Sequence, residues 1–164
     1  MSRLTAGGVT TDVVRDPQGA PVSQRTSAGK QFFLSDRLGS TVGLTDSTGA
    51  IVREYTYDPD GNATSTGSGA TSELRYAGGH VVGGYYHYAA RYYHPDTMRW
   101  TQQDPLDQVS DLAEANRYAY VGGDPVNSVD PSGLRGAYVE GGCGPLGASY
   151  KENSRGRLLS LIHI

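Results

Sequence analysis

Two aspartates that each precede a proline, Asp104 and Asp130, are the residues whose type and context could do chemistry. Two carboxylates held close together resist simultaneous ionisation, so one of them keeps a proton. The ionised member can then activate a water molecule while the protonated member protonates a leaving group, as in an aspartic protease. The sequence therefore predicts Asp104 and Asp130 as a candidate acid–base pair for hydrolysis.

The same two aspartates also have a structural interpretation. Asp before Pro is a common turn signal, because the Asp side chain accepts a hydrogen bond from the turn backbone and Pro sets the next φ angle. Three further Asp-Pro pairs begin at Asp16, Asp58 and Asp124. Taken by themselves, the residues favour this structural role, and both interpretations stay open at this point.

The other chemically capable side chains lack partners in the sequence. His87 and His94 are seven residues apart, but no cysteine or carboxylate pattern completes a metal site. We expect both on a strand face, and we predict no metal and no cofactor. Arg91 lies among tyrosines, and a net charge of −3 favours cation–π packing over stacking on nucleic acid.

Three more residues are assigned no chemistry. Asp107 and Asp111 are expected to be solvated or to cap the N-terminus of a helix. Cys143 has no identifiable base partner and is taken as incidental. Because it is the only cysteine, an internal disulfide framework is excluded.

The elements that must position the two acids are short strands between frequent turns. Runs of four to eight residues rich in Tyr and Val separate the turns and predict an all-β fold of antiparallel hairpins, with at most one short helix at 111–116. The sequence Asp-x-x-Gly encodes a type I turn, with Asp at the first position and Gly at the last. It occurs five times, at Asp16–Gly19, Asp36–Gly39, Asp46–Gly49, Asp58–Gly61 and Asp130–Gly133.

The segments between these turns differ in composition. A loop is expected at 61–72, which is rich in Gly, Ser, Thr and Ala. Beyond residue 134 the chain is Gly-rich and then polar, and we expect a tail without a folded domain and with fast hydrogen exchange. Strands are expected at 12–15, 31–35, 40–45, 50–57, 73–77, 84–93 and 116–121.

The composition narrows the class of protein. Only 37% of the 164 residues are hydrophobic, and the chain has 12 tyrosines but only two phenylalanines. This composition favours a large sheet with thin cores, in which the tyrosine hydroxyls meet water. The mild negative charge predicts no attraction to nucleic acid or to an anionic membrane. No apolar run reaches transmembrane length and the N-terminus has no apolar signal core, so delivery would depend on other machinery.

The ordered motifs from Gly84 to Leu134 resemble the Rhs repeat-associated core domain of the Rhs/YD-repeat proteins. Ala90–Pro95 is similar to the family's Ala-Arg-Tyr-Tyr-Asp-Pro, and Asp104-Pro105 to its first Asp-Pro motif. Asn116–Val121 is similar to its Asn-x-Tyr-x-Tyr-Val, and Pro125–Leu134 to its terminal signature.

Upstream, Asp36–Asn62 resembles a YD repeat, so the resemblance covers roughly residues 31–134. The chain departs from the family pattern at three places. His94 replaces an Asp, Met98 replaces a Gly, and Asp107-Gln108 stands where the family has Gly-Leu.

The resemblance implies a fold and a function. Family members wind YD repeats into a hollow β-shell around a C-terminal toxin, the core domain plugs one end, and the chain is cut after Asp-Pro-x-Gly-Leu. It implies Asp104 and Asp130 as the catalytic pair and a cut between Leu134 and Arg135. The expected organisation is a poorly defined segment (1–30), a YD-repeat-like β region (31–83), a plug (84–134) and a variable or disordered tail (135–164).

The resemblance also implies partners and location. We expect a C-terminal fragment of a larger bacterial polymorphic toxin, partnered by the remainder of the shell, an encapsulated toxin and a secretion-system component. No nucleic-acid partner and no membrane span are expected, and the protein would be secreted, delivered by a secretion system or associated with the cell surface. The alternative is a non-enzymatic structural or adhesive YD-repeat module.

Overall fold

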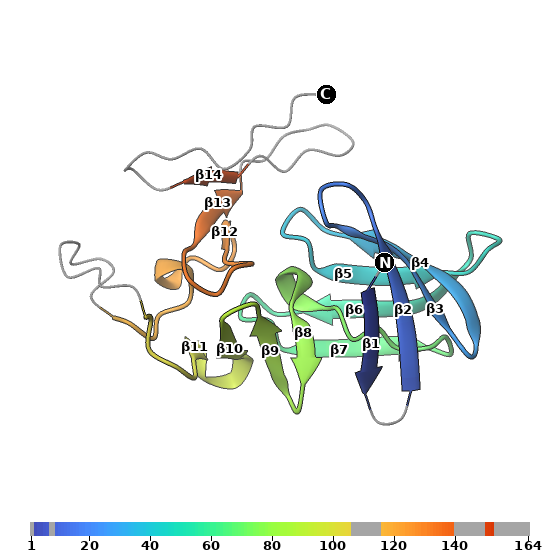
Figure 1. Ribbon diagram of the computed structural model, residues 1–164, viewed down its shortest axis with the longest axis horizontal. Helices are drawn as coiled ribbons and strands as arrows, with labels where there is room; N and C mark the ends of the chain where they lie inside the picture. Colours follow the sequence, from blue (N-terminus) through green and yellow to red (C-terminus); the bar gives the residue numbers. More distant parts are fainter. Residues whose placement is uncertain (1, 7–8, 106–115, 140–149, 153–164) are drawn as a thin grey trace.

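The computed structural model describes residues 2–6, 9–105, 116–139 and 150–152, and it confirms an all-β fold of antiparallel sheets (Figure 1). The largest sheet is a seven-stranded meander in which each strand pairs with its neighbours in sequence. Its strands are β1 (Ser2–Ala6), β2 (Val9–Arg15), β3 (Pro21–Thr26), β4 (Gly29–Ser35), β5 (Thr41–Thr45), β6 (Ile51–Tyr57) and β7 (Ala63–Gly67).

Two smaller sheets follow the meander. The four-stranded sheet has the order β11-β10-β9-β8, with β8 (His80–Val82), β9 (Tyr85–Tyr88), β10 (Arg91–His94) and β11 (Arg99–Trp100). The three-stranded sheet has the order β12-β13-β14, with β12 (Ser128–Val129), β13 (Ala137–Val139) and β14 (Tyr150–Glu152). The helical elements of the described residues are three 3-10 turns of three residues each, η1 (Tyr76–Gly78), η2 (Pro95–Thr97) and η4 (Val121–Gly123).

Four of the five Asp-x-x-Gly sequences form hairpin turns of the meander, as predicted. At the β4–β5 turn, the Gly39 amide donates to the Asp36 carbonyl at 3.1 Å, and the Ser40 amide donates to Asp36 Oδ1 at 2.8 Å. Gly39 has a φ of +83°, which glycine adopts without steric cost. The turns at 16–19, 46–49 and 58–61 have the same amide-to-carbonyl bond. Local turn chemistry therefore sets the register of the meander.

Two expected strands in the middle of the chain are wrong. The segment 84–93 is split into β9 and β10 by a turn at Ala89-Ala90. The segment 73–77 forms only an isolated bridge at Leu74 before it enters η1. It crosses the meander, where the Thr41 amide donates to the Arg75 carbonyl, so tertiary contacts rather than a strand ladder satisfy its backbone.

Other boundaries also differ from the expectation. The expected loop 61–72 contains β7, which completes the hydrogen bonding of β6. The expected strand 116–121 makes a single bridge, between Arg99 and Ala119, and runs into η4. Residues 111–115 of the expected helix lie outside the described residues.

The expected domain organisation stays a prediction, and strands also form in segments where few or none were expected. Residues 1–30 hold β1 to β3 and the start of β4 rather than one strand at 12–15. The limit at 83/84 falls inside the β8–β9 hairpin. In the expected tail, 137–139 and 150–152 form β13 and β14, because β12 pairs with β13 and β13 in turn pairs with β14.

An aromatic core joins the meander to the smaller sheets. The hydroxyls of Tyr76, Tyr86 and Tyr93 donate to the carbonyls of Pro59, Gly61 and Asp60, at 2.7, 2.7 and 2.8 Å, so they do not depend on water as the sequence suggested. Burial raises the pKa of Tyr86 to about 12. The core consists of Tyr76, Ala77, Tyr86, Tyr88, Tyr93, Trp100, Tyr120, Val129 and Val139.

Candidate active site

The Asp130–Gly133 turn is docked against the β9–β10 turn. The Ala90 amide, in the β9–β10 turn, donates to the Ser132 carbonyl at 3.1 Å. Gly133 has a φ of +66°, and a Cβ at this position would lie 2.9 Å from both the Arg91 nitrogen and the Tyr88 carbonyl oxygen. Glycine is therefore required here both for the backbone angle and for the close approach of the two turns.

Asp130 is buried, with 1% of the residue exposed, and its side chain reaches the peptide bond after Leu134. Its Oδ1 accepts hydrogen bonds from the Ser132 hydroxyl at 2.8 Å, from the Leu134 amide at 3.2 Å and from the Arg135 amide at 3.1 Å. The Arg135 nitrogen belongs to the bond that the sequence predicts to be cut. One predicted acid thus lies in contact with the leaving nitrogen of the predicted cleavage site.

Arg91 brings the two predicted acids together. Its Nη2 lies 3.0 Å from Asp104 Oδ2 and 3.4 Å from Asp130 Oδ2. Its Nε donates to the Gly133 carbonyl, and its guanidinium carbon lies 4.3 Å from the centre of the Trp100 ring. The side chain is 4% exposed, so one buried cation is shared by two carboxylates.

Asp104 is held by backbone contacts with the segment before β12. Its amide donates to the Arg117 carbonyl at 2.9 Å, and Arg117 Nη2 donates to the Asp104 carbonyl at 2.5 Å. The residue is 8% exposed. The departure at Asp107-Gln108 lies outside the described residues.

The sequence singled out the two acids, whose catalytic role stays a prediction, but their ion pairs with Arg91 were not predicted from it. The expected cation–π contact is present, with Trp100 as the ring. The missed signal is the alternation of β10, which places Arg91 and Tyr93 on its buried face. An inward-facing arginine needs a carboxylate partner, because a buried unpaired charge is costly.

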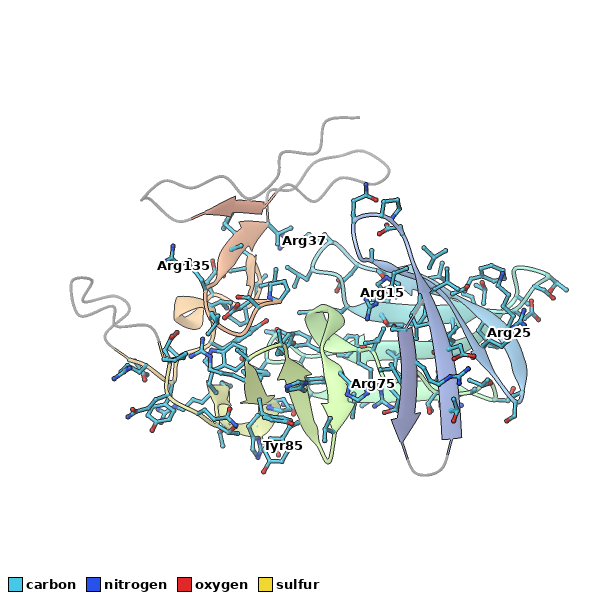
Figure 2. The ribbon with its side chains drawn as sticks, viewed as in Figure 1. Arg15, Arg25, Arg37, Arg75, Tyr85 and Arg135 are labelled. Atoms are coloured by element: carbon cyan, nitrogen blue, oxygen red, sulfur yellow. The ribbon has the colours of Figure 1, made fainter. Side chains whose placement is uncertain are left out.

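The two histidines lie on strands, as expected. The His87 ring centre is 4.5 Å from that of Tyr92, and the His94 ring centre is 4.9 Å from that of Tyr85, which Figure 2 labels. In the part of the chain that the structure describes, no group of three or more His, Cys, Asp or Glu side chains could hold a metal ion. Asp111 and Cys143 lie outside that part. Across the same residues, no helix has the length and apolar character needed to cross a membrane.

The chain is similar to short segments of much larger proteins, although no protein-family model matches it. It is 36% identical over 110 residues to tRNA nuclease WapA of Bacillus subtilis (strain 168), covering 63% of this chain and 5% of that protein. It is 33% identical over 126 residues to double-stranded DNA deaminase toxin A of Burkholderia cenocepacia, covering 73% and 8%. It is 37% identical over 105 residues to salivary gland surface protein 1 of Aedes aegypti, covering 61% and 3%.

Solved structures show a similarity of the same kind, to a small part of a larger protein. The chain matches the crystal structure of TcdB2-TccC3 with a TM-score of 0.66 and 27% identity, over 77% of this chain and 7% of that one. The crystal structure of TcdB2-TccC3 without its hypervariable C-terminal region matches equally, with a TM-score of 0.65 over the same 77%. The matched part of the fold therefore lies outside that hypervariable region. This chain is similar, over most of its length, to a small part of much larger proteins, among them a named toxin.

Proposed function

We propose that this chain is the last part of an Rhs-type shell together with its plug, and that it cuts its own backbone between Leu134 and Arg135 to free a C-terminal toxin. The observation that carries the proposal is the contact of Asp130 Oδ1 with the Arg135 nitrogen, 3.1 Å away, while Arg91 holds Asp104 beside Asp130. A paired acid and a peptide bond thus meet at one buried place.

The similar proteins support a role in presenting a toxin rather than acting as one. Their names give different activities, a tRNA nuclease and a double-stranded DNA deaminase, while the matched segments cover only 5% and 8% of them. A segment common to proteins of different activity is suited to a shared task such as enclosure or release. The toxin itself would then follow the plug in the longer protein.

The proposed reaction is a hydrolysis in which each acid has one role. Asp104, as a carboxylate, takes a proton from a water molecule, and the water oxygen forms a bond to the Leu134 carbonyl carbon. Asp130, whose Oδ1 accepts the Arg135 N–H in the structure, first takes up a proton from solvent. It then gives this proton to the Arg135 nitrogen, and the bond between that nitrogen and the Leu134 carbonyl carbon breaks. The products are the Leu134 carboxyl group and a new amino terminus at Arg135.

Arg91 is proposed as a positioning residue for this step. It contacts both acids and the Gly133 carbonyl, one residue before the cleaved bond. Its planar guanidinium can serve several oxygens at once, which lysine does not reproduce. It therefore fixes the acids relative to the backbone that they cut.

The test belongs in the longer protein, analysed by mass spectrometry. Wild type should yield a fragment that begins at Arg135, and Asp104→Asn or Asp130→Asn should abolish it. Asp124→Asn is the matched control, since Asp124 also precedes Pro in the plug but is exposed and its side chain contacts Asn127. Cleavage that persists in both variants, or a cut at another bond, would exclude the mechanism.

A non-enzymatic surface module is the second candidate. It is favoured by the similarity to a salivary gland surface protein and by the Arg91 ion pairs, which give both acids a structural role without chemistry. A longer protein that folds with the same strand content but stays uncut would support this alternative.

A further inference from the structure

The residues just after the proposed cleavage bond are built into the plug. β13 pairs with β12 through Ser128↔Tyr138 and Val129↔Ala137. The Val139 amide donates to the Asn127 carbonyl at 2.7 Å, and the Val139 side chain is 1% exposed within the aromatic core. A cut before Arg135 would leave these contacts in place, because none of them uses the broken bond.

An arginine from the meander closes over the same segment. Arg37, in the β4–β5 turn, donates from Nη1 to the Val139 carbonyl at 3.4 Å and from Nη2 to Asn127 Oδ1 at 3.2 Å. Its Nη2 also donates to the Val126 carbonyl. Figure 2 shows Arg37 and Arg135 on opposite sides of β13. One side chain therefore joins the meander, the segment that leads into β12 and the strand after the cut.

We propose that β12 and Arg37 form a binding site for the new amino-terminal segment of the cleavage product, which stays attached as an added β-strand. The proposal rests on the proposed cleavage for its product, but not for its contacts. Cleavage of the chain and release of the product would then be separate steps, and release would require β13 to separate from β12.

The contacts indicate which segments this site accepts. Binding uses backbone groups of β13, so it depends only weakly on the side chains of the bound segment, as in other cases of strand addition. The Tyr138 side chain is 49% exposed, so most side chains fit there. Val139 fills the core beside Val129, so a small β-branched apolar residue is required at that position. The partner is thus an extended segment with an apolar residue five positions into the new chain.

The test separates retention from self-cleavage by cutting the chain with an added protease. A recognition site for a sequence-specific protease is inserted between Leu134 and Arg135 of the full chain, and the cut protein is run on a size-exclusion column. We expect the downstream fragment to elute with the plug. Arg37→Ala should speed its dissociation at least tenfold, while Arg25→Ala, which removes an exposed arginine of β3, should leave it unchanged.

Hydrogen exchange of the uncut chain gives a second measure. The Val139 amide should exchange at least tenfold faster in Arg37→Ala than in wild type or Arg25→Ala. Immediate separation of the fragment in wild type, or equal retention and equal exchange in both variants, would overturn the proposal. Failure of the chain to cut itself would count against the proposed function alone, because the added protease supplies the cut.

Discussion

Removing the Arg91 guanidinium should destabilise the fold strongly, whatever the chain does chemically. Arg91→Gln leaves two carboxylates side by side, with exposed fractions of 8% for Asp104 and 1% for Asp130, and without the cation that they share. Loss of one partner of a buried ion pair costs about 3–5 kcal/mol. Domains are stable by only about 5–15 kcal/mol, so the variant should lie close to unfolding.

The assay is urea unfolding of the full chain at pH 7, followed by far-UV circular dichroism. Arg91→Gln should lower the free energy of unfolding by about 3–5 kcal/mol, whereas Arg99→Gln, an exposed arginine on the neighbouring strand, should change it by about 0.5 kcal/mol or less. Adding Asp104→Asn to Arg91→Gln should recover roughly 1–3 kcal/mol, since one of the two uncompensated charges is removed.

Two results would refute this reasoning. The first is a cost of less than about 1 kcal/mol for Arg91→Gln, which is the size expected for an exposed ion pair. The second is a double variant that is less stable than Arg91→Gln alone. Either result would mean that the carboxylates do not depend on Arg91 for their burial.

Two further predictions concern the backbone and pH. Gly133→Ala should lower the free energy of unfolding by about 1–3 kcal/mol more than Gly122→Ala, measured by thermal or urea unfolding. Both glycines have a φ of +66°, but only at Gly133 would the added Cβ meet backbone atoms. Equal costs for the two variants would contradict the docked turn. The free energy of unfolding should be constant from pH 7 to about 9 and fall above pH 10. Burial raises the folded-state pKa of core tyrosines above the unfolded value of about 10, so the unfolded chain loses these protons first. The slope should be about 1.4 kcal/mol per pH unit for each such tyrosine, and an unfolding free energy that stays flat to pH 12 would show that the hydroxyls are not desolvated. The tyrosines in question are Tyr88, Tyr93 and Tyr120.

The turns and the strands between them could be predicted from the sequence because their signals are local. Asp at the first position and Gly at the last are sufficient for turns such as Asp36–Gly39. The strands 40–45 and 50–57 lie between such turns, and the strand 31–35 ends at one. The all-β class follows from the same short-range chemistry, which needs no knowledge of the rest of the chain.

The errors occur where tertiary contacts decide the backbone. The segment 73–77 has strand-like residues but crosses the meander, and 116–121 is held by single bonds to other segments rather than by a ladder. β13 was missed because its partner β12 is only two residues long, and its further contacts, Val139 in the aromatic core and the hydrogen bond from Arg37, come from distant parts of the chain.

For the candidate site, too, the residue types could be predicted from the sequence but the contacts between them could not. Residue type and the Asp-Pro context singled out Asp104 and Asp130, and the motif around Asp130 predicted a turn that ends beside Leu134. Their meeting at Arg91 could not be read from spacing, because the three residues lie on three segments that the folded sheets bring together. The sequence by itself determined which groups could act, while the tertiary structure decided which of them touch, since contact between distant residues depends on how the whole chain packs.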